Sequence, residues 1–368
     1  MQLKTTPLHD EHQKLGARMV DFGGWHMPIQ YTSISQEHEA CRKAVALFDV
    51  SHMGEIRVRG ENALNWLQTM VTNNLEKIKD GQAQYNVLCY ENGGCVDDII
   101  VYRIAYNDLF ICVNASNTDK DFEWLKQHQP TGVTVTNESA EWGQIAVQGP
   151  QAQALCERVC SITLGDMKYY HFTQATIQGS PAIIARTGYT GEDGFELYVA
   201  REKTASIWNL LLTEGKSYGV LPAGLAARDT LRTEMKFALY GHEISETLNP
   251  IEAGLAWVVK FDKGPFIGAD ALQKIKASPT RRHLVGLKTT GRGIPRQGYN
   301  VYAEMNATNA VGTITSGTLS PSLKHGIAIA YVDHAVAKIG TRVFVKIRDE
   351  FVEHVVTETP FYKRQKLL

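Results

Sequence analysis

Apolar side chains recur along most of the chain with one of two spacings. Apolar residues three and four positions apart predict amphipathic helices, whereas alternation of apolar and polar residues predicts strands. At the start of the first helical segment, Ser33 and Gln36 have the spacing of a capping box, in which two side chains satisfy free backbone N–H groups. The helical spacing occupies seven segments, at residues 33–44, 61–71, 116–128, 150–160, 203–217, 224–233 and 268–278.

Strand-like segments lie between these helices. The clearest hairpin joins residues 84–90 to residues 95–105, and we expect Asn-Gly-Gly at 92–94 to supply the positive φ angles of its turn. Another strand follows at 108–115. Because strands and helices do not alternate in regular βαβ units, the pattern predicts an α+β fold and not a doubly wound sheet.

The last quarter of the chain has a different pattern from the rest. A polar segment at 276–282 precedes it, so we divide the chain into domains at 1–278 and 279–368. Short strands with glycine or proline turns predict that the C-terminal domain is a small β-barrel or sandwich. These six strands are expected at residues 283–289, 298–303, 311–315, 326–333, 341–347 and 350–358.

Composition and charge exclude several classes of protein. Hydrophobic residues make up 43% of the 368 residues and charged residues 21%, which is ordinary for a folded protein. The net charge of -1 provides no excess of cations for nucleic acid or a membrane surface. The longest apolar runs, such as residues 327–332, are far shorter than the ~20 residues of a membrane span.

The N-terminal sequence and the cysteines point to the cytoplasm. Residues 1–12 contain acidic side chains and no apolar core, which does not fit a secretory signal. The six cysteines form no CxxC pair and are too sparse for a disulfide framework, so we expect them to be reduced. The histidines lack the third ligand or carboxylate that a metal site needs, and we therefore expect no metal.

Nucleotide-binding motifs fail on their spacing. Gly215, Lys216 and Ser217 imitate the end of a phosphate loop, but Leu210 replaces the required upstream glycine. The glycine-rich segment 291–298 lacks both the dinucleotide-binding spacing and a following helix. We therefore interpret the first segment as a helix end and the second as a turn.

Two adjacent aspartates begin an otherwise apolar strand. Neighbouring side chains of a strand point to opposite faces, so Asp98 shares its face with Ile100 and Tyr102, while Asp97 lies on the other face. An anonymous Asp-Asp pair commonly does no more than solvate a turn. A carboxylate in line with Ile100 and Tyr102 instead predicts a pocket floor with one acid in it.

Two further segments could hold a flat, polar ligand. In residues 186–199, three regularly spaced glycines would let the backbone approach a ligand, Tyr189 offers a stacking face, and Glu196 could accept two hydrogen bonds from an amino-heterocycle. Arg228 and Arg232 share one helix face, with Asp229 and Glu234 available as ion-pair partners. Their guanidinium groups could instead bind an anion or a heterocycle carbonyl. A solvent-facing turn and a solvated helix are the plain alternatives.

Together these segments resemble the aminomethyltransferase, or T-protein, family of the glycine cleavage system. The resemblance runs from Thr6 to the C-terminal PFYKR. It rests on TPLHDEH, GARMVDFGGWHMPIQY, FDVSHMGE, ENGGCVDDIIVYR, RTGYTGEDGFELYV, PAGLAARDTLRTE, LYGHEI, NPIEAGLAWVVK and TSGTLSPSLKHGIAIAYV.

The resemblance implies a three-lobed, folate-binding α+β fold whose residues 1–278 form two interleaved subdomains and whose C-terminal domain is a β-barrel. It further implies a cytoplasmic monomer that moves the methylene of an aminomethyl group from the lipoyl arm of the H-protein to tetrahydrofolate and releases ammonia. Asp98 matches the catalytic carboxylate. Either Lys363 or Arg364 could meet the folate tail, because Lys363 stands where the family commonly has arginine. The other positions implied to contact or adjoin folate are Met53, Tyr85, Ile100, Tyr102, Asn114, Tyr189, Glu196, Arg228 and Trp257.

Other members of the same superfamily offer competing functions. Non-catalytic folate-binding assembly or RNA-modification factors carry a cysteine-containing KGCYxGQE-like segment, whereas this chain has FALYGHEI at 237–244. Relatives fused to a flavin domain are disfavoured by the missing dinucleotide motif. A tetrahydrofolate-dependent demethylase stays open, because few residues around a folate pocket decide which donor is used.

Overall fold

The computed structural model describes residues 2–279 and 282–364. The chain forms two compact units, one of residues 1–86 and 97–228 and the other of residues 87–96 and 229–368. Among the described residues, no helix is long and apolar enough to cross a membrane.

The first unit begins with a short helix and a two-stranded sheet that the apolar spacing does not reveal. Helix α1 (His9–Lys14) precedes β1 (Arg18–Phe22), which pairs antiparallel with β2 (Trp25–Gln30). Helix α2 (Ile34–Lys43) follows, and Ser33 caps it by accepting a hydrogen bond from the backbone N–H of Gln36 at 3.3 Å. The predicted Ser33 cap is therefore confirmed, while the side chain of Gln36 accepts the hydroxyl of Ser33 at 3.2 Å.

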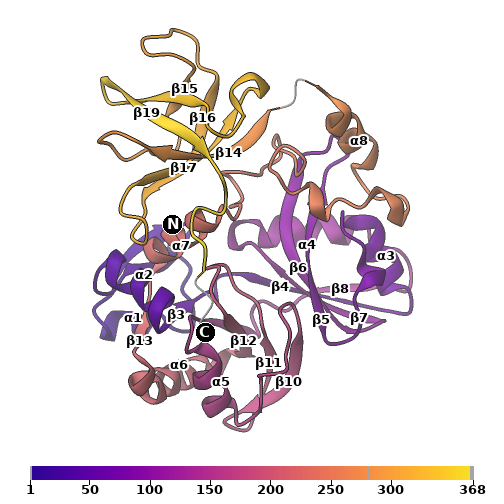
Figure 1. Ribbon diagram of the computed structural model, residues 1–368. Coiled ribbons are helices and arrows are strands. Elements are labelled where there is room, and N and C mark those ends of the chain that lie inside the picture. Colours follow the sequence, from indigo (N-terminus) through magenta and orange to yellow (C-terminus); the bar gives the residue numbers. More distant parts are fainter. Residues whose placement is uncertain (1, 280–281, 365–368) are drawn as a thin grey trace. The chain divides into compact units, whose positions relative to one another are not determined.

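A six-stranded sheet forms one half of the first unit (Figure 1). Helices α5 (Ala152–Cys160) and α6 (Thr204–Glu214) pack against it through a core that includes Trp208 and Phe195. The strand order is β10 (Phe172–Ile177), β11 (Ser180–Ala185), β12 (Gly194–Ala200), β9 (Trp142–Gln148), β3 (Val45–Asp49) and β13 (Val220–Pro222).

A five-stranded sheet carries the two adjacent aspartates. Helices α3 (Ala63–Met70) and α4 (Thr118–Gln127) belong to the same region of the chain. Buried side chains from both sheets meet in one apolar cluster, in which Tyr102 and Phe110 pack with Tyr198. The strand order is β5 (Gln82–Cys89), β6 (Cys95–Ala105), β7 (Asp108–Val113), β4 (Gly54–Arg59) and β8 (Thr134–Asn137).

The six predicted C-terminal strands close into a barrel in the second unit. Its interior is filled by small and branched apolar side chains, among them Leu287, Val301 and Val345. This barrel and the mixed helix and sheet content confirm the predicted fold class. Around the barrel the strands are β14 (His283–Thr289), β17 (Gly326–Val332), β16 (Gly312–Leu319), β15 (Asn300–Tyr302), β18 (Arg342–Ile347) and β19 (Glu350–Thr357).

In residues 2–279 and 282–364, the remaining helices are two α-helices and seven short 3₁₀ segments. Helix α7 (Leu225–Met235) crosses from the first unit to the second, and α8 (Ala269–Ala277) lies in the second unit. The 3₁₀ segments are Leu75–Lys77, Ala115–Asn117, Arg201–Lys203, Gly215–Tyr218, Ala256–Val258, Phe261–Lys263 and His334–Val336.

Two local predictions need correction. In the turn at 91–94, only Gly93 has a positive φ, of 88°. The side chain of Asn92 instead accepts the N–H of Gly94 at 2.9 Å, which closes the turn without a left-handed backbone at Asn92. The helix predicted at 203–217 ends at Glu214, and a 3₁₀ segment continues to Tyr218. The domain limit at residue 278 stays a prediction.

Candidate active site

Strand β6 turns its two aspartates to opposite faces. Asp97 is fully buried, whereas Asp98 is partly exposed, as is Ile100 two residues later. The two Asp98 oxygens each accept one side-chain hydrogen bond: Oδ2 from the hydroxyl of Tyr85 at 2.9 Å, and Oδ1 from Nδ2 of Asn114 at 2.8 Å. Asp98 is therefore held in a fixed orientation by groups from two other parts of the chain.

The environment of Asp98 changes its acidity. Burial and, to a smaller extent, the negative charge of Asp97 raise the pKa of this carboxyl to about 7. The hydrogen bonds from Tyr85 and Asn114 oppose this rise by favouring the charged form. A carboxyl with a pKa close to neutral can both stabilise a cation and exchange a proton at physiological pH.

Asp97 anchors the amide that orients Asp98. Its Oδ2 accepts the backbone N–H of Asn114 at 2.9 Å, and its Oδ1 accepts Nδ2 of Asn114 at 2.9 Å and Nδ2 of Asn117 at 2.6 Å. Asn114 thus connects the buried carboxylate to the partly exposed one. Both oxygens of Asp97 therefore act as hydrogen-bond acceptors for N–H groups.

Glu196 is a second carboxylate, on strand β12, and it is almost completely buried. Its Oε2 accepts the hydroxyl of Thr187 at 2.5 Å, and its Oε1 accepts Nε2 of Gln144 at 3.2 Å. Burial raises the pKa of Glu196, while Thr187, the charge of Arg228 and Gln144 act in the opposite direction. A carboxylate has about four acceptor positions, so two positions remain for a ligand.

Arg228 and Tyr189 form a stacked pair near Glu196. The guanidinium carbon of Arg228 lies 4.7 Å from the centroid of the Tyr189 ring, within the range of a cation–π contact. The charge of Arg228 also acts on Glu196 and on the buried His52, whose pKa falls to about 4 chiefly because of burial. The positive charge of Arg228 therefore acts on several groups of this region.

The apolar residues predicted around the site join the cluster between the two sheets. Met53 and Ile100 pack against it and stay partly exposed. Tyr102 is fully buried, and its hydroxyl lies 2.9 Å from that of Tyr198, which accepts a hydrogen bond from Gln144 at 3.1 Å. Tyr102 is thus connected to Glu196 through Tyr198 and Gln144.

Comparison with known proteins assigns the family. The GCVT N-terminal domain matches residues 8–263, and the glycine cleavage T-protein C-terminal barrel domain matches residues 282–363. The chain is 50% identical over 360 residues to an aminomethyltransferase of Bdellovibrio bacteriovorus, covering 98% of this chain and 99% of the relative. The chain belongs to the glycine cleavage T-protein family.

Further T-protein relatives agree over the whole length. An aminomethyltransferase of Chloroherpeton thalassium is 48% identical over 365 residues, which is 99% of this chain and 100% of that one. The crystal structure of glycine cleavage system aminomethyltransferase T from Bartonella henselae superimposes with a TM-score of 0.91, at 34% identity and 99% coverage of both chains.

Two of the three glycines of residues 186–199 have close neighbours inside the first unit, and their predicted approach to a ligand stays a prediction. A Cβ atom at Gly188 would lie 2.1 Å from Oε1 of Gln148, and one at Gly194 would lie 2.5 Å from both Nε2 of Gln148 and the carbonyl oxygen of Val147. Of the three glycines, only Gly191 has a positive φ, of 81°. Gly188 and Gly194 are therefore required by close packing inside this T-protein domain.

Three residues of the T-protein match lie in the second unit. Trp257 is 58% exposed, and Lys363 and Arg364 are exposed near the end of the described chain. Nζ of Lys363 lies 3.6 Å from the carboxylate of Glu358. The choice between Lys363 and Arg364 as the folate-tail contact stays open.

Arg232 does not share the surroundings of Arg228. It is almost fully buried in the second unit, where it donates to Asp229 at 2.6 Å, to Glu243 at 3.1 Å and to Ser316 at 2.7 Å. The predicted pairing with Asp229 is thus found, whereas Glu234 accepts hydrogen bonds from Ser322 at 2.9 Å and from Ser320. The contacts of Arg232 therefore stabilise the structure of the second unit.

Sequence reasoning missed the groups that surround the two carboxylates. Thr187 and Gln144 hold Glu196, and Asn117 helps to hold Asp97, but none of them was predicted as a site residue. Asn117 alone had a usable signal, because it follows Asn114 at the start of a predicted helix. The pairing of β9 with β12 decides the position of Gln144, and the segment between β11 and β12 decides that of Thr187.

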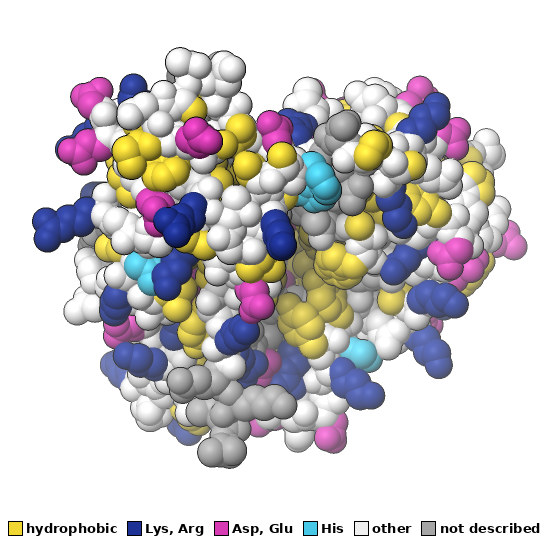
Figure 2. All heavy atoms as spheres, turned by 45° about the horizontal axis from the view of Figure 1, so that its top comes forward, with side chains coloured by type: hydrophobic (Ala, Val, Ile, Leu, Met, Phe, Trp, Pro, Cys, Tyr) yellow, Lys and Arg dark blue, Asp and Glu magenta, His cyan; other side chains and the backbone are white. Residues whose placement is uncertain are grey.

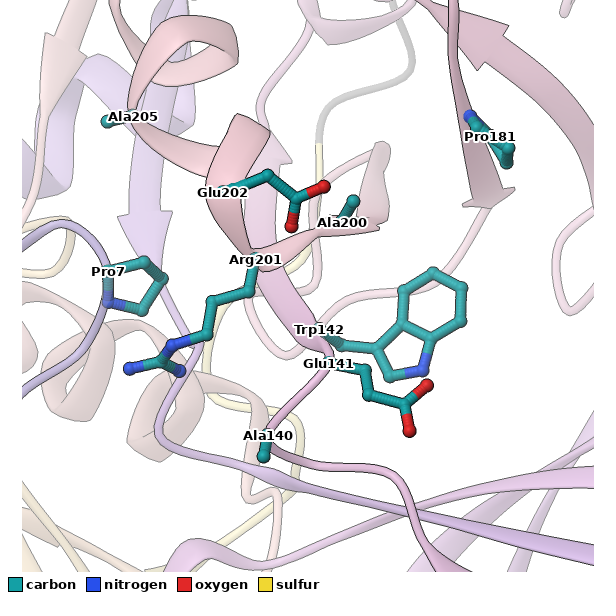
Figure 3. Close-up of a pocket in the computed structure, with 9 residues that line it drawn as sticks. All are labelled: Pro7, Ala140, Glu141, Trp142, Pro181, Ala200, Arg201, Glu202 and Ala205. Atoms are coloured by element: carbon teal, nitrogen blue, oxygen red, sulfur yellow. The ribbon is translucent and has the colours of Figure 1, made fainter.

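A hollow at the surface of the first unit contains none of the predicted site residues. It has a volume of about 760 Å³ and lies at the ends of strands β9 and β12. Figure 3 shows the Arg201 side chain extending toward Pro7 and the Trp142 ring pointing away from it. The polar groups of this hollow do not converge, in contrast to those around Asp98 and Glu196.

Over residues 2–279 and 282–364, no group of three or more His, Cys, Asp or Glu side chains could hold a metal ion.

Proposed function

We propose that this chain is an aminomethyltransferase of glycine cleavage, which transfers the methylene of an aminomethyl group from the lipoyl arm of the H-protein to tetrahydrofolate. The products are 5,10-methylenetetrahydrofolate, ammonia and the reduced lipoyl arm. The observation that carries this proposal is a T-protein sequence at 50% identity over 98% of the chain, combined with an oriented carboxylate at Asp98.

The residues of the first unit fit a reduced folate. Glu196 has acceptor positions left for the amino edge of a pterin after binding Thr187 and Gln144. Tyr189, backed by Arg228, offers a ring face on which a flat heterocycle could stack. Tyr85, Asp98 and Asn114 stay partly exposed, as groups that line an opening do.

The chemistry explains the need for Asp98. One folate nitrogen attacks the methylene, ammonia leaves, and the second nitrogen closes the ring and expels the thiolate. Positive charge develops at the methylene carbon and at the attacking nitrogen, so a fixed carboxylate lowers the barrier electrostatically and can receive a proton. Asp98 acts by charge and orientation and forms no covalent bond to the substrate.

The remaining parts of the proposal concern partners and location. We propose that the H-protein is the macromolecular partner of this protein. We further propose that the protein binds no metal and is a monomer in the cytoplasm. The six cysteines are all unpaired and buried, as in proteins of reducing compartments. Figure 2 shows both Lys or Arg and Asp or Glu side chains on one face of the molecule.

The competing function is a tetrahydrofolate-dependent demethylase that uses the same folate pocket. The test supplies the protein with tetrahydrofolate and either aminomethyl-loaded H-protein or methylated amines and sulfur compounds. We expect ammonia and methylenetetrahydrofolate in equal amounts from the loaded H-protein only. Turnover of a methylated donor without turnover of the loaded H-protein would contradict the proposal and show that the protein is a demethylase.

A further inference from the structure

A third aspartate lies behind the Asp97–Asp98 pair. Asp121 is on the first turn of helix α4, and its side chain is fully buried. Neither of its carboxyl oxygens has an N–H or hydroxyl donor from the described residues as partner. A buried carboxylate in this position would be strongly disfavoured, because nothing replaces the hydrogen bonds it made to water.

The carboxylate of Asp97 lies within hydrogen-bond reach of the Asp121 side chain and acts on its pKa more strongly than any other charged group. Two ionised carboxylates cannot hydrogen-bond to each other, since both only accept. A hydrogen bond between them requires one proton, held by one of the two groups. The environment of Asp97 decides which group holds it.

Asp97 is already committed as an acceptor. Three N–H groups, two from Asn114 and one from Asn117, donate to its oxygens at 2.6–2.9 Å. A carboxylate has about four acceptor positions, so one position remains for a hydroxyl donor. A proton placed on Asp97 instead would have to displace one of these short N–H contacts.

We propose that Asp121 is a protonated carboxylic acid that donates its hydroxyl hydrogen to Asp97, and that it acts as a positioning residue for Asp98. This role rests on the proposed function. Asp121 fixes Asp97, Asp97 fixes Asn114, and Asn114 orients the catalytic carboxylate. No bond of the substrate is made or broken at Asp121.

The charges around Asp121 agree with this arrangement. Burial and the charge of Asp97 raise the pKa of Asp121 well above its ordinary value, with a smaller contribution from Asp98, while Lys120 on the same helix opposes them. With Asp121 neutral, the three aspartates carry at most two negative charges. An ionised Asp121 would add a third charge beside Asp98 and make ionisation of Asp98 still harder.

Infrared difference spectroscopy tests the proton directly. The spectrum of wild type minus Asp121→Asn at pH 8 should contain the C=O stretch of a protonated carboxylic acid, shifted in deuterium oxide. Asp119→Asn is the matched control, because Asp119 lies exposed on the same helical turn and should contribute only carboxylate bands. A wild-type spectrum in which Asp121 also contributes only carboxylate bands would overturn the proposal.

Kinetics test the effect on Asp98. Asp121→Asn keeps a neutral donor toward Asp97, so the acid limb of the pH profile of kcat should stay within about 0.3 pH units of wild type. Asp121→Ala removes the donor, and its kcat should fall at least about tenfold with little change in KM for folate. A purely structural role would lower the melting temperature of Asp121→Ala without this split between kcat and KM, and would overturn the positioning role.

These outcomes separate the inference from the proposed function. If wild type fails to turn over loaded H-protein, the proposed function fails, but the infrared band still reports the proton on Asp121. If turnover is normal and Asp121→Asn shifts the acid limb to lower pH, Asp121 is ionised in wild type and the inference fails alone.

Discussion

The hydroxyl of Tyr85 donates a hydrogen bond of 2.9 Å to Oδ2 of Asp98. This bond favours the charged form of the carboxyl and opposes the rise in pKa caused by burial. It also aligns Asp98, because the other oxygen is held by Asn114 at 2.8 Å. The acidity and the direction of Asp98 are therefore set by the same contacts.

Removal of the Tyr85 hydroxyl should separate these effects from folate binding. In Tyr85→Phe the pKa of Asp98 should rise, so the acid limb of the kcat profile should move to higher pH and kcat at pH 7 should fall at least about threefold. Tyr106→Phe, which changes an exposed tyrosine of the same unit, is the control. An acid limb at the same pH in Tyr85→Phe and wild type would show that Tyr85 does not act on the pKa of Asp98.

Glu196 should contribute to affinity more than to rate. A buried donor pair of a ligand that loses its acceptor costs about 1–3 kcal/mol, so Glu196→Ala should weaken tetrahydrofolate binding by about fivefold to about 100-fold. Titration calorimetry measures the Kd, and kcat at saturating folate should change less. Glu202→Ala, at an exposed position, should bind as wild type does. Equal affinity of wild type and Glu196→Ala would dismiss this role.

The raised pKa of Asp98 should also affect stability. The unfolded chain holds this carboxyl at its ordinary pKa of 3.8, whereas the folded protein holds it at about 7. Between these values the folded state binds the extra proton, so Asp98 lowers the free energy of unfolding as pH rises, and the loss is complete above pH 7. Relative to wild type, Asp98→Asn should gain at least about 1 kcal/mol between pH 4 and pH 8. Urea unfolding at both pH values measures this gain, and a constant difference would contradict it.

Close packing makes a separate prediction at Gly194. Its Cβ would approach the carbonyl oxygen of Val147 to 2.5 Å inside a buried strand pair, so Gly194→Ala should lower the free energy of unfolding by about 1–3 kcal/mol. Gly165→Ala is the matched control, because its nearest neighbour is the flexible end of Gln153 at 3.3 Å. Chemical denaturation compares the two, and equal stability would show that the strands can adjust.

The sequence predicts local periodicity well, and contacts between distant segments poorly. Alternation along β6 places Asp97 and Asp98 on opposite faces, and the structure agrees in their burial. Likewise, the short strands after residue 282 correctly predict a barrel. Both inferences need only the geometry of single strands and turns.

The contacts that tune the carboxyl groups depend on pairing between strands. Glu196 meets Gln144 because β12 lies beside β9, and that neighbour relationship is not written in either segment. Asp121 looks like an ordinary acidic residue at a helix start, where a carboxylate is commonly exposed and stabilised by the helix dipole. Only the packing of α4 places it against Asp97.

The role of Asp98 is tested most directly by turnover of Asp98→Asn with aminomethyl-loaded H-protein at saturating tetrahydrofolate. We expect at least about a tenfold loss of kcat, because the amide cannot stabilise the developing cation, with a Kd for folate close to that of wild type. Ammonia release and calorimetric titration of the same preparation supply both values. Unchanged turnover in Asp98→Asn would contradict a catalytic role for this carboxylate.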